Sequence, residues 1–309
     1  MAETQPPSMW KDETLTLNQL KYFLAIIGAG SISKASRQIF VAQPALSNQI
    51  KLLEDELGQI LFYRNANGVV LTEAGKKLQD RAIGILRQVD ALKEELTSSI
   101  SEPVGSLAIG LAMALNMRMS EQIYRKLNDS YPKLRVRLME SMSGFLPQLL
   151  EDGQIDLALA YDAKPYRNHK VEKLGHESLY WVTTPKNVRM RKPHADFDTI
   201  QKIGLILPGF PHSLRLLIDR QFHLHGLRPN IKIEVDSTYT IKKMIVSENL
   251  SSILSVHTVK EEVESGQLVA LPIQKPSIDR DIHLVTGYQR QNDPIVALAR
   301  NAIVELFQT

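Results

Sequence analysis

The chain has 309 residues, of which 43% are hydrophobic and 23% are charged, and its formal net charge is +3. This length is too great for one ordinary hydrophobic core and predicts two or three compact units of a globular protein. No run of about 18 apolar residues is present, which argues against a membrane-spanning helix. The absence of cysteine excludes disulfides, cysteine-ligated zinc or iron–sulfur centres and a thiol redox switch.

The N-terminal region begins with a polar segment and continues with an uneven distribution of charge. The first fourteen residues, MAETQPPSMWKDET, lack the basic start and apolar middle of a secretory signal, so we expect a disordered tail over 1–14 and a cytoplasmic protein. From residue 15 to residue 53 there is no Asp or Glu, whereas Lys21, Lys34, Arg37 and Lys51 are basic. A locally cationic stretch on a nearly neutral chain is a modest signal for a polyanionic partner.

Two short helices joined by a tight turn are predicted between residues 31 and 57. The stretch SISKASRQIF offers Ser31 or Ser33 as a helix cap, and its small residues Ala35 and Ser36 let another helix approach closely. A four-residue connection, VAQP, follows, and its Pro44 suits the first turn of the next helix. This arrangement indicates a helix-turn-helix unit.

The second of these helices has two faces of different chemistry. The apolar face, predicted to be buried, consists of Leu46, Ile50, Leu53 and Leu57. The opposite face, free of carboxylates, consists of Pro44, Ser47, Asn48 and Lys51. A helix that enters the DNA major groove must be slim, must offer donors and acceptors, and must not repel phosphate. The candidate DNA-binding residues from both helices are Ser33, Lys34, Arg37, Gln43, Pro44, Ser47, Asn48, Gln49 and Lys51. The alternative is a solvated helix face in an ordinary three-helix domain.

A β-hairpin is predicted after Gly58, because ILFYRNANGVVLT alternates and contains Asn67-Gly68, a strong turn signal. Such a hairpin would be the wing of a winged helix-turn-helix. Arg64, near its tip, is a further candidate DNA-binding residue that could enter a minor groove, and an ordinary surface arginine is the equal alternative.

A helix of some 28 residues is predicted to begin at about Thr72. Apolar residues recur along it in a strict four-three alternation typical of a coiled-coil seam. The seam is shorter than the roughly three to four heptads that identify a coiled coil from sequence. The candidate dimerisation residues are Leu78, Ala82, Ile85, Val89, Leu92 and Leu96. The alternative is an amphipathic helix that packs on its own chain.

The first part of the chain resembles a known family. The stretch SISKASRQIFVAQPALSNQIKLLEDELGQILFYRNANGVVLTEAG closely resembles, without gaps, the winged helix-turn-helix signature of LysR-type transcriptional regulators. The matching positions are Ser33, Ala35, Gln43, Pro44, Ala45, Leu46, Ser47, Ile50, Leu53, Glu54, Leu57, Gly58, Leu61, Phe62, Arg64, Leu71, Thr72, Ala74 and Gly75. Ser36 stands where the family usually has a second alanine. Further along, LPGFPHSLRLLIDRQF resembles the branch that contains the nitrogen assimilation control regulator.

Beyond a small, polar hinge, strands and helices alternate. The strands are nearly continuous in apolar residues, which suits a parallel sheet covered on both faces and predicts an α/β region. The predicted strands lie at 106–113, 134–140, 155–161, 203–208, 231–236, 251–256 and 278–287. The predicted helices lie at 118–130, 144–152, 212–225, 239–247 and 294–307.

The resemblance implies an architecture for the whole chain: a DNA-binding domain, a dimerising linker helix and a ligand-sensing domain, with dimers often paired into tetramers. The sensing domain would comprise two Rossmann-like lobes resembling type 2 periplasmic binding proteins, with chain crossings near 162–180 and 272–283. The expected domains are 15–75 for DNA binding, 76–100 for the linker helix, 101–106 for the hinge and 107–309 for effector binding. Lobe I would span 107–165 and 280–309, and lobe II would span 166–279.

Three loops are candidates for the effector site, because ligands of such folds bind where strands end and helix N-termini offer free N–H groups. They are AMALNMR, ESMSGF and LPGFPHS. The candidate effector-binding residues are Asn116, Arg118, Ser141, Ser143, Pro208, His212 and Ser213. For each serine a simple helix cap is an equal alternative. In a further loop, Asn249 and Ser251 stand where relatives often have glycine, which predicts a narrower or more polar pocket.

These features together predict a ligand-responsive LysR-type regulator, with an anionic metabolite as effector, an inverted-repeat operator in double-stranded DNA, and RNA polymerase as a further partner. No cofactor or metal is expected. An enzyme is disfavoured, since no nucleophile elbow, P-loop or zinc helix is found, and His223 and His225 are not a convincing metal pair. A solute-binding protein for transport would explain the second half alone.

Overall fold

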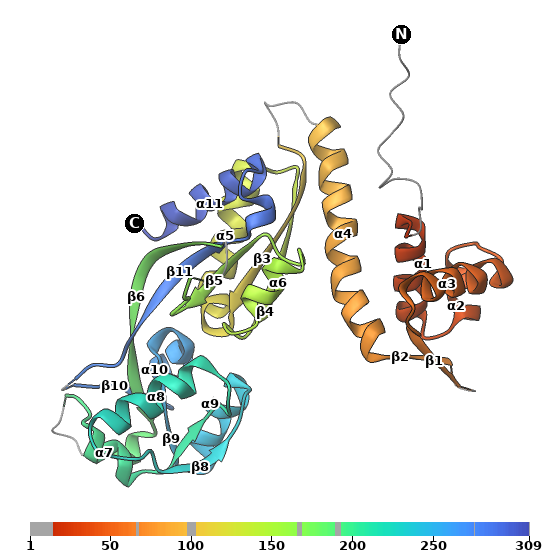
Figure 1. The fold of residues 1–309 in the computed structure, drawn as a ribbon. Helices are drawn as coiled ribbons and strands as arrows, with labels where there is room; N and C mark the ends of the chain where they lie inside the picture. Colours follow the sequence, from red (N-terminus) through yellow and green to blue (C-terminus); the bar gives the residue numbers. More distant parts are fainter. Residues whose placement is uncertain are drawn as a thin grey trace. The chain divides into compact units, whose positions relative to one another are not determined.

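The computed structural model describes residues 15–65, 68–97, 103–165, 169–188, 193–274 and 276–308, apart from the side chains of 94–97 and 289. These residues fall into two compact units, one within 1–97 with 152–154 and one within 98–151 with 155–309 (Figure 1). The predicted tail over 1–14, residues 98–102 of the predicted linker helix and hinge, and Asn67 of the predicted turn lie outside the described residues. No helix among the described residues is long and apolar enough to cross a membrane.

The first unit contains three helices, a two-stranded hairpin and a long helix. Their bounds are α1 (Leu17–Ala29), α2 (Ile32–Gln38), α3 (Gln43–Leu57), β1 (Phe62–Asn65), β2 (Gly68–Leu71) and α4 (Glu73–Thr97). Local chemistry sets the helix ends. Thr16 and Gln19 form a capping box at the start of α1, and Gly30 ends that helix in the left-handed conformation. Ser31 caps α2 by accepting a hydrogen bond from the backbone N–H of Lys34.

Apolar faces of α1 and α3 and the base of the hairpin form the core of the first unit. Its buried side chains include Phe23, Ile26, Leu46, Ile50, Leu53 and Phe62. The prediction that Leu57 completes the buried stripe of α3 is wrong, because this side chain is 38% exposed. Leu57 is the last residue of the helix, and Gly58 turns the chain away from the core with φ +60°.

The hairpin is attached to α3 by a carboxylate. Glu54 accepts hydrogen bonds from the backbone N–H groups of Leu61 (2.8 Å) and Phe62 (3.3 Å). The two strands then pair antiparallel from Phe62 opposite Leu71 to Asn65 opposite Gly68. The first acidic residue after the acid-free stretch is therefore used to position the wing.

The second unit consists of two α/β lobes. Lobe I contains β3 (Gly105–Ala112), α5 (Met113–Ser130), β4 (Leu134–Ser141), α6 (Leu146–Glu151), β5 (Leu157–Tyr161) and α11 (Pro294–Leu306). Lobe II contains α7 (Phe197–Lys202), β7 (Leu205–Leu207), α8 (Ser213–Leu224), β8 (Ile231–Glu234), α9 (Thr238–Ser247), β9 (Ser251–Ser255), α10 (Lys260–Glu264) and β10 (Val269–Pro272). Within each lobe the central strands are parallel: β3 pairs with β4 and β5, and β7 pairs with β8 and β9.

Two long strands connect the lobes. They are β6 (Lys170–Thr183) and β11 (Asp279–Thr286), which pair antiparallel and run side by side from one lobe to the other (Figure 1). The resulting strand order is β4-β3-β5-β11-β6-β9-β7-β8, with β10 paired to β6. The chain therefore crosses between the lobes twice, once along each of these strands.

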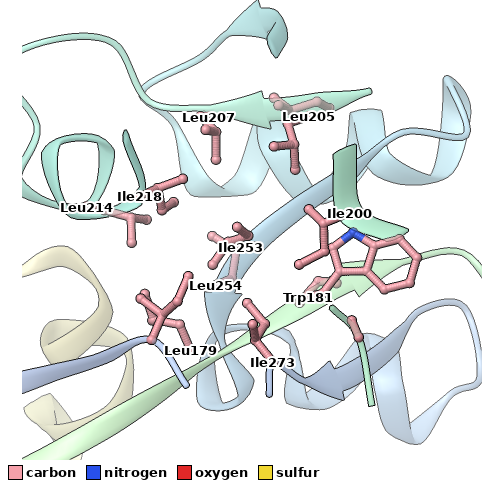
Figure 2. Packing of buried hydrophobic residues seen from close by; sticks show 14 of the residues in the cluster. Leu179, Trp181, Ile200, Leu205, Leu207, Leu214, Ile218, Ile253, Leu254 and Ile273 are labelled. Carbon is pink, nitrogen blue, oxygen red and sulfur yellow. The ribbon is translucent and has the colours of Figure 1, made fainter. Parts of the chain in front are cut away.

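Each lobe has its own hydrophobic core. The core of lobe II includes Trp181 of β6, whose ring lies beside Ile200 of α7 (Figure 2) and which pairs across the sheet with Ile253 of β9. In lobe I the largest cluster is built on apolar residues of β3 and β5 and is covered by α5 and α11. Its members on these two strands include Leu107, Ile109, Leu111, Leu157 and Leu159. The two lobes therefore have separate cores and are joined by the two crossing strands.

The second unit differs from the sequence prediction in the start of one helix and in several elements that were not predicted. The helix predicted at 118–130 begins at Met113, directly after β3, because Met113, Ala114 and Leu115 favour a helix and no loop intervenes. The strand β6 is not predicted from the sequence, since its first half, KVEKLGHES, is largely charged and shows no apolar run. The short elements α7, α10 and β10 are likewise absent from the sequence prediction.

Candidate functional site

The candidate DNA-binding residues lie on three neighbouring elements of the first unit. Ser33, Lys34 and Arg37 are exposed on α2, and Gln43, Pro44, Asn48 and Lys51 are exposed on α3, with Ser47 and Gln49 half-buried there. Arg64 is exposed on β1. These ten residues are called here the reading surface, and they supply cations, amides and hydroxyls but no carboxylate. Pro44 stands in the first turn of α3, as its fixed φ favours.

A side-chain hydrogen bond connects the wing to α3. The Arg64 guanidinium donates to the hydroxyl of Ser47 over 3.3 Å, so the wing and the middle of α3 present their polar groups together. On α2, the Arg37 side chain donates to the backbone carbonyl of Ser33 over 3.3 Å. The reading surface is therefore partly ordered by contacts among its own members.

The apolar seam of α4 is partly uncovered. Ile85 is 39% exposed and Leu92 is 54% exposed, whereas Leu78 packs against the core of the first unit. The side chain of Leu96 lies outside the described residues. Exposed large apolar residues at seven-residue spacing are the pattern that a partner helix covers.

A cavity of about 340 Å³ lies between the two lobes of the second unit. Lobe I contributes the ends of β3 and β4 and the start of α5, and lobe II contributes the starts of α8 and α9 and the end of β9. Arg280 of the crossing strand β11 also lines the cavity. Its volume is that of a small-molecule site, and any occupant would touch both lobes and one strand that joins them.

Helix N-termini face this cavity. The first residues of α5, Met113 and Ala114, line it, and no side chain among the described residues caps this 18-residue helix. The start of α8 is capped by His212, whose Nδ1 accepts from the backbone N–H of Leu214 over 3.1 Å. An uncapped helix N-terminus offers backbone donors and a positive dipole end to a ligand.

A buried ion pair lies at the junction of the lobes. Two nitrogens of Arg280 donate to one oxygen of Glu177 over 2.9 and 2.7 Å, and each side chain is 5% exposed. The hydroxyl of Ser255, from lobe II, donates to the other oxygen over 2.8 Å, and Arg118, from lobe I, lies 3.9 Å from it. The guanidinium of Arg280 also stacks on the ring of Tyr161, 3.3 Å from its centroid. Glu177 therefore connects both lobes to both crossing strands.

Burial and charge act in opposite directions on Glu177. Burial alone raises the pKa of its carboxyl group. The charge of Arg280 and the hydrogen bonds that the carboxylate accepts lower this pKa by a larger amount, so the net pKa lies below its ordinary value. The pKa of His212 is also lowered, first by burial and then by the nearby charge of Arg280, with Asp236 opposing. His212 is therefore neutral at pH 7, which agrees with its role as an acceptor in the helix cap.

The structure brings five of the seven candidate effector-binding residues to the cavity. The residues that line it are Ser141, Ser143, Pro208, His212 and Ser213. Asn116 and Arg118 lie within α5 rather than in a loop and are not among the lining residues. Asn116 instead donates to Glu140, which does line the cavity, over 2.8 Å. Sequence reasoning missed Arg280, because its partner Glu177 is 103 positions away and neither residue stands in a local motif.

The predicted effect of Asn249 and Ser251 on the pocket is wrong, since neither residue is among the described residues that line the cavity. Asn249 adopts a left-handed conformation, with φ +51°, and accepts a hydrogen bond from Thr184 over 2.6 Å. Ser251 is fully buried and donates to the backbone carbonyl of Gly204. Both side chains therefore form hydrogen bonds within lobe II.

Within the part of the chain that the structure describes, no three histidine, aspartate or glutamate side chains gather as a metal site would require. His225 stacks on Phe197, with ring centroids 4.4 Å apart, and its Nδ1 lies 2.8 Å from the carbonyl oxygen of Gln221. This ring is therefore packed at the end of α8.

Comparison with known proteins gives matches over nearly the whole chain. The family model for the bacterial regulatory helix-turn-helix protein, lysR family, matches residues 17–76, and the model for the LysR substrate binding domain matches residues 101–308. The chain is 31% identical over 297 residues to the nitrogen assimilation regulatory protein nac of Klebsiella aerogenes, with 94% of this chain and 95% of the relative covered. The corresponding protein of Escherichia coli strain K12 is 30% identical over 234 residues, with 75% and 76% covered.

Solved structures share the fold. CbnR, a LysR family transcriptional regulator, matches with a TM-score of 0.74 and 20% identity, covering 96% of this chain and 100% of CbnR. CbnR complexed with its target DNA matches with a TM-score of 0.73 and 20% identity, covering 95% and 100%. A full-length OxyR variant from Pseudomonas aeruginosa matches with a TM-score of 0.69 and 20% identity, covering 96% of each chain.

Proposed function

This chain belongs to the LysR family of bacterial transcriptional regulators, and from that premise we propose that it controls transcription in response to a small anionic metabolite bound between the lobes. The observation that carries the proposal is the cavity of about 340 Å³ that both lobes and the crossing strand β11 line. An occupant there favours one arrangement of the lobes over another, and its differential affinity for the two shifts their populations. The regulator acts by binding, without catalysis, in the cytoplasm.

The proposed partner of the first unit is an inverted-repeat operator in double-stranded DNA. The start of α3 lies in the major groove, where Gln43 or Asn48 can pair with an adenine edge. Lys34 and Arg37 of α2 contact phosphates, which position the helix without specifying sequence. Support comes from the exposed reading surface, which lacks carboxylates, and from the family match over residues 17–76. RNA polymerase is a further proposed partner of the DNA-bound form.

We propose that α4 pairs with α4 of a second copy and that such dimers pair into tetramers. Ile85→Glu is expected to weaken self-association at least about 100-fold, because a carboxylate in the seam of a coiled coil is buried without a partner. Sedimentation velocity of the full chain over a concentration series measures this. Ala91→Glu, which introduces the same side chain on α4 but off the seam, should leave association unchanged. An Ile85→Glu variant that assembles like the wild type would contradict the proposed dimer.

The anionic nature of the effector is supported by the donors at the cavity. The uncapped N-terminus of α5 favours negative charge, and Arg280 also lines the cavity, although Glu177 already compensates its charge. Two carboxylates, Glu140 of lobe I and Asp236 of lobe II, oppose a negative charge, and both are exposed at the cavity. We propose that the anionic group lies at the N-terminus of α5, where the backbone donors have no side-chain cap and the two carboxylates are more solvated.

This charge arrangement predicts the effect of a single substitution. Asp236→Asn is expected to strengthen effector binding about 3-fold at low salt, because it removes a repulsive charge that solvent partly screens. Isothermal titration with the identified effector at two salt concentrations measures the change. Asp198→Asn, on the exposed part of α7 and away from the cavity lining, should have no effect. Weaker binding by Asp236→Asn would show that the effector presents a cation or donor there instead.

Two screens test the proposed function as a whole. Selection of duplexes from a random pool by the full chain should enrich an inverted repeat, and a thermal-shift screen of small carboxylates and phosphates should find one that raises the Tm of the second unit. If no duplex is enriched and a metabolite binds to a compact monomer, a solute-binding protein becomes the better account. Genes that flank the enriched sites in the genome would indicate the metabolite.

A further inference from the structure

The turn between α2 and α3 presents an aromatic ring to solvent. Phe40 is 95% exposed, the highest value among the large apolar side chains of the described residues. It stands three positions before Gln43, the first residue of α3. An exposed phenylalanine contributes nothing to the hydrophobic core, so its presence here is not explained by packing.

The backbone at this position also disfavours phenylalanine. The N–H of Val41 donates to the carbonyl of Ser36 over 3.0 Å, which closes the turn that ends α2 and places Phe40 in the left-handed region, with φ +56°. Glycine and asparagine adopt this conformation most easily, whereas a Cβ-bearing aromatic residue is strained. The other described residues with left-handed φ are glycines, Asp162 and Asn249, which are types that tolerate it.

Neither packing nor the turn therefore favours Phe40, and a residue that the fold disfavours points to a partner. The chain segments on either side of it belong to the reading surface, with Arg37 before it and Gln43 after it, and both are exposed. No carboxylate occurs within this part of the sequence, which favours a polyanion over an ordinary protein partner.

We propose that Phe40 packs against the apolar surface of DNA at the edge of the groove that α3 enters. The shared chemistry is apolar and is supplied by deoxyribose or by a thymine methyl group. This inference rests on the proposed function, because it requires α3 to bind a duplex. It adds a contact at the turn itself, where the polar readout of α3 does not reach.

The test relies on a substitution that should raise the stability of the first unit while weakening its binding to DNA. In the full chain, Phe40→Asn should raise the Tm of the first unit by about 2 °C, since the strain is relieved and no buried contact is lost. The same variant should bind the duplex selected by the wild type about 10-fold more weakly. Phe40→Tyr, which keeps the ring, should retain affinity within about 2-fold. Leu224→Asn, at a residue that is 65% exposed on α8, is the control and should leave DNA affinity unchanged.

The outcomes separate clearly. Equal DNA affinity of Phe40→Asn and the wild type overturns the proposal, and so does a lowered Tm, which would reveal a packing role. If the wild type itself selects no duplex, the proposed function fails instead. Replacing thymine by uracil at each position of the duplex distinguishes the two sources. If removal of one methyl group weakens binding of the wild type but not of Phe40→Asn, the contact is with that methyl group. If Phe40→Asn weakens binding equally to every uracil-substituted duplex, the contact is with deoxyribose.

Discussion

Ser47→Glu is expected to abolish sequence-specific DNA binding, with at least about a 100-fold loss of affinity for the selected duplex, while the fold of the first unit is retained. The substitution places a carboxylate in the middle of the reading surface, where the proposed complex would set it against phosphates and base acceptors. Ser47 is half-buried, and its hydroxyl accepts from Arg64 over 3.3 Å. A glutamate there can still pair with Arg64, so the domain should fold normally.

Fluorescence anisotropy with labelled duplex at two salt concentrations measures this loss. Leu52→Glu is the matched control, because Leu52 is 47% exposed on the same helix but rotated by about 140° from Ser47. The control should bind DNA within about 3-fold of the wild type. Wild-type affinity in Ser47→Glu, with circular dichroism showing an intact fold, would mean that this face of α3 does not meet DNA.

Arg280→Met is expected to destabilise the second unit by about 3 kcal/mol at pH 7. The substitution leaves the Glu177 carboxylate buried, with Ser255 donating to it and Arg118 lying 3.9 Å away. Thermal unfolding of the full chain measures the effect as a lowered Tm of that unit. The double variant Glu177→Gln with Arg280→Met should recover most of the loss, because no buried charge remains.

The difference in stability between the wild type and Arg280→Met should also depend on pH. In the wild type the pKa of Glu177 is lowered, so its stabilising contribution is present above the unfolded pKa and is lost as pH falls through the folded pKa. In Arg280→Met the pKa of the Glu177 carboxyl group should rise. At a pH where this group is protonated, the variant no longer buries an unpaired charge and is destabilised less relative to the wild type. The gap between wild type and variant should therefore narrow from pH 8 to pH 5. A constant gap would show that the lost stability comes from packing, such as the stack of Arg280 on Tyr161.

The features that could be predicted from the sequence are those with local causes. The cap at Ser31, the proline in the first turn of α3, and the apolar periodicity of the helices depend on residues within a few positions of one another. The family signature is likewise local and dense. These features are sufficient to place the helix-turn-helix and most strands of the two lobes correctly.

The remainder depends on contacts between distant positions. The pairing of Glu177 with Arg280 follows from the register of β6 and β11, which no local pattern specifies. The same register explains why the charged first half of β6 is a strand. The exposure of Leu57 and the early start of α5 differ from the prediction because each depends on where the chain turns, to within about one helical turn. The exposure of Phe40 could not be predicted from the sequence. Burial is predicted from the apolar periodicity of helices and strands, and a residue in a turn belongs to no such pattern.

Dimethyl sulfate protection of the selected duplex by the wild-type chain tests the central claim most directly, because the reagent methylates guanine N7 in the major groove and adenine N3 in the minor groove. Binding of α3 in the major groove predicts protected guanines in both halves of the inverted repeat, on one face of the duplex, and loss of this protection in Ser47→Glu. A wild-type complex that leaves every guanine N7 reactive, with protection confined to adenine N3, would contradict it.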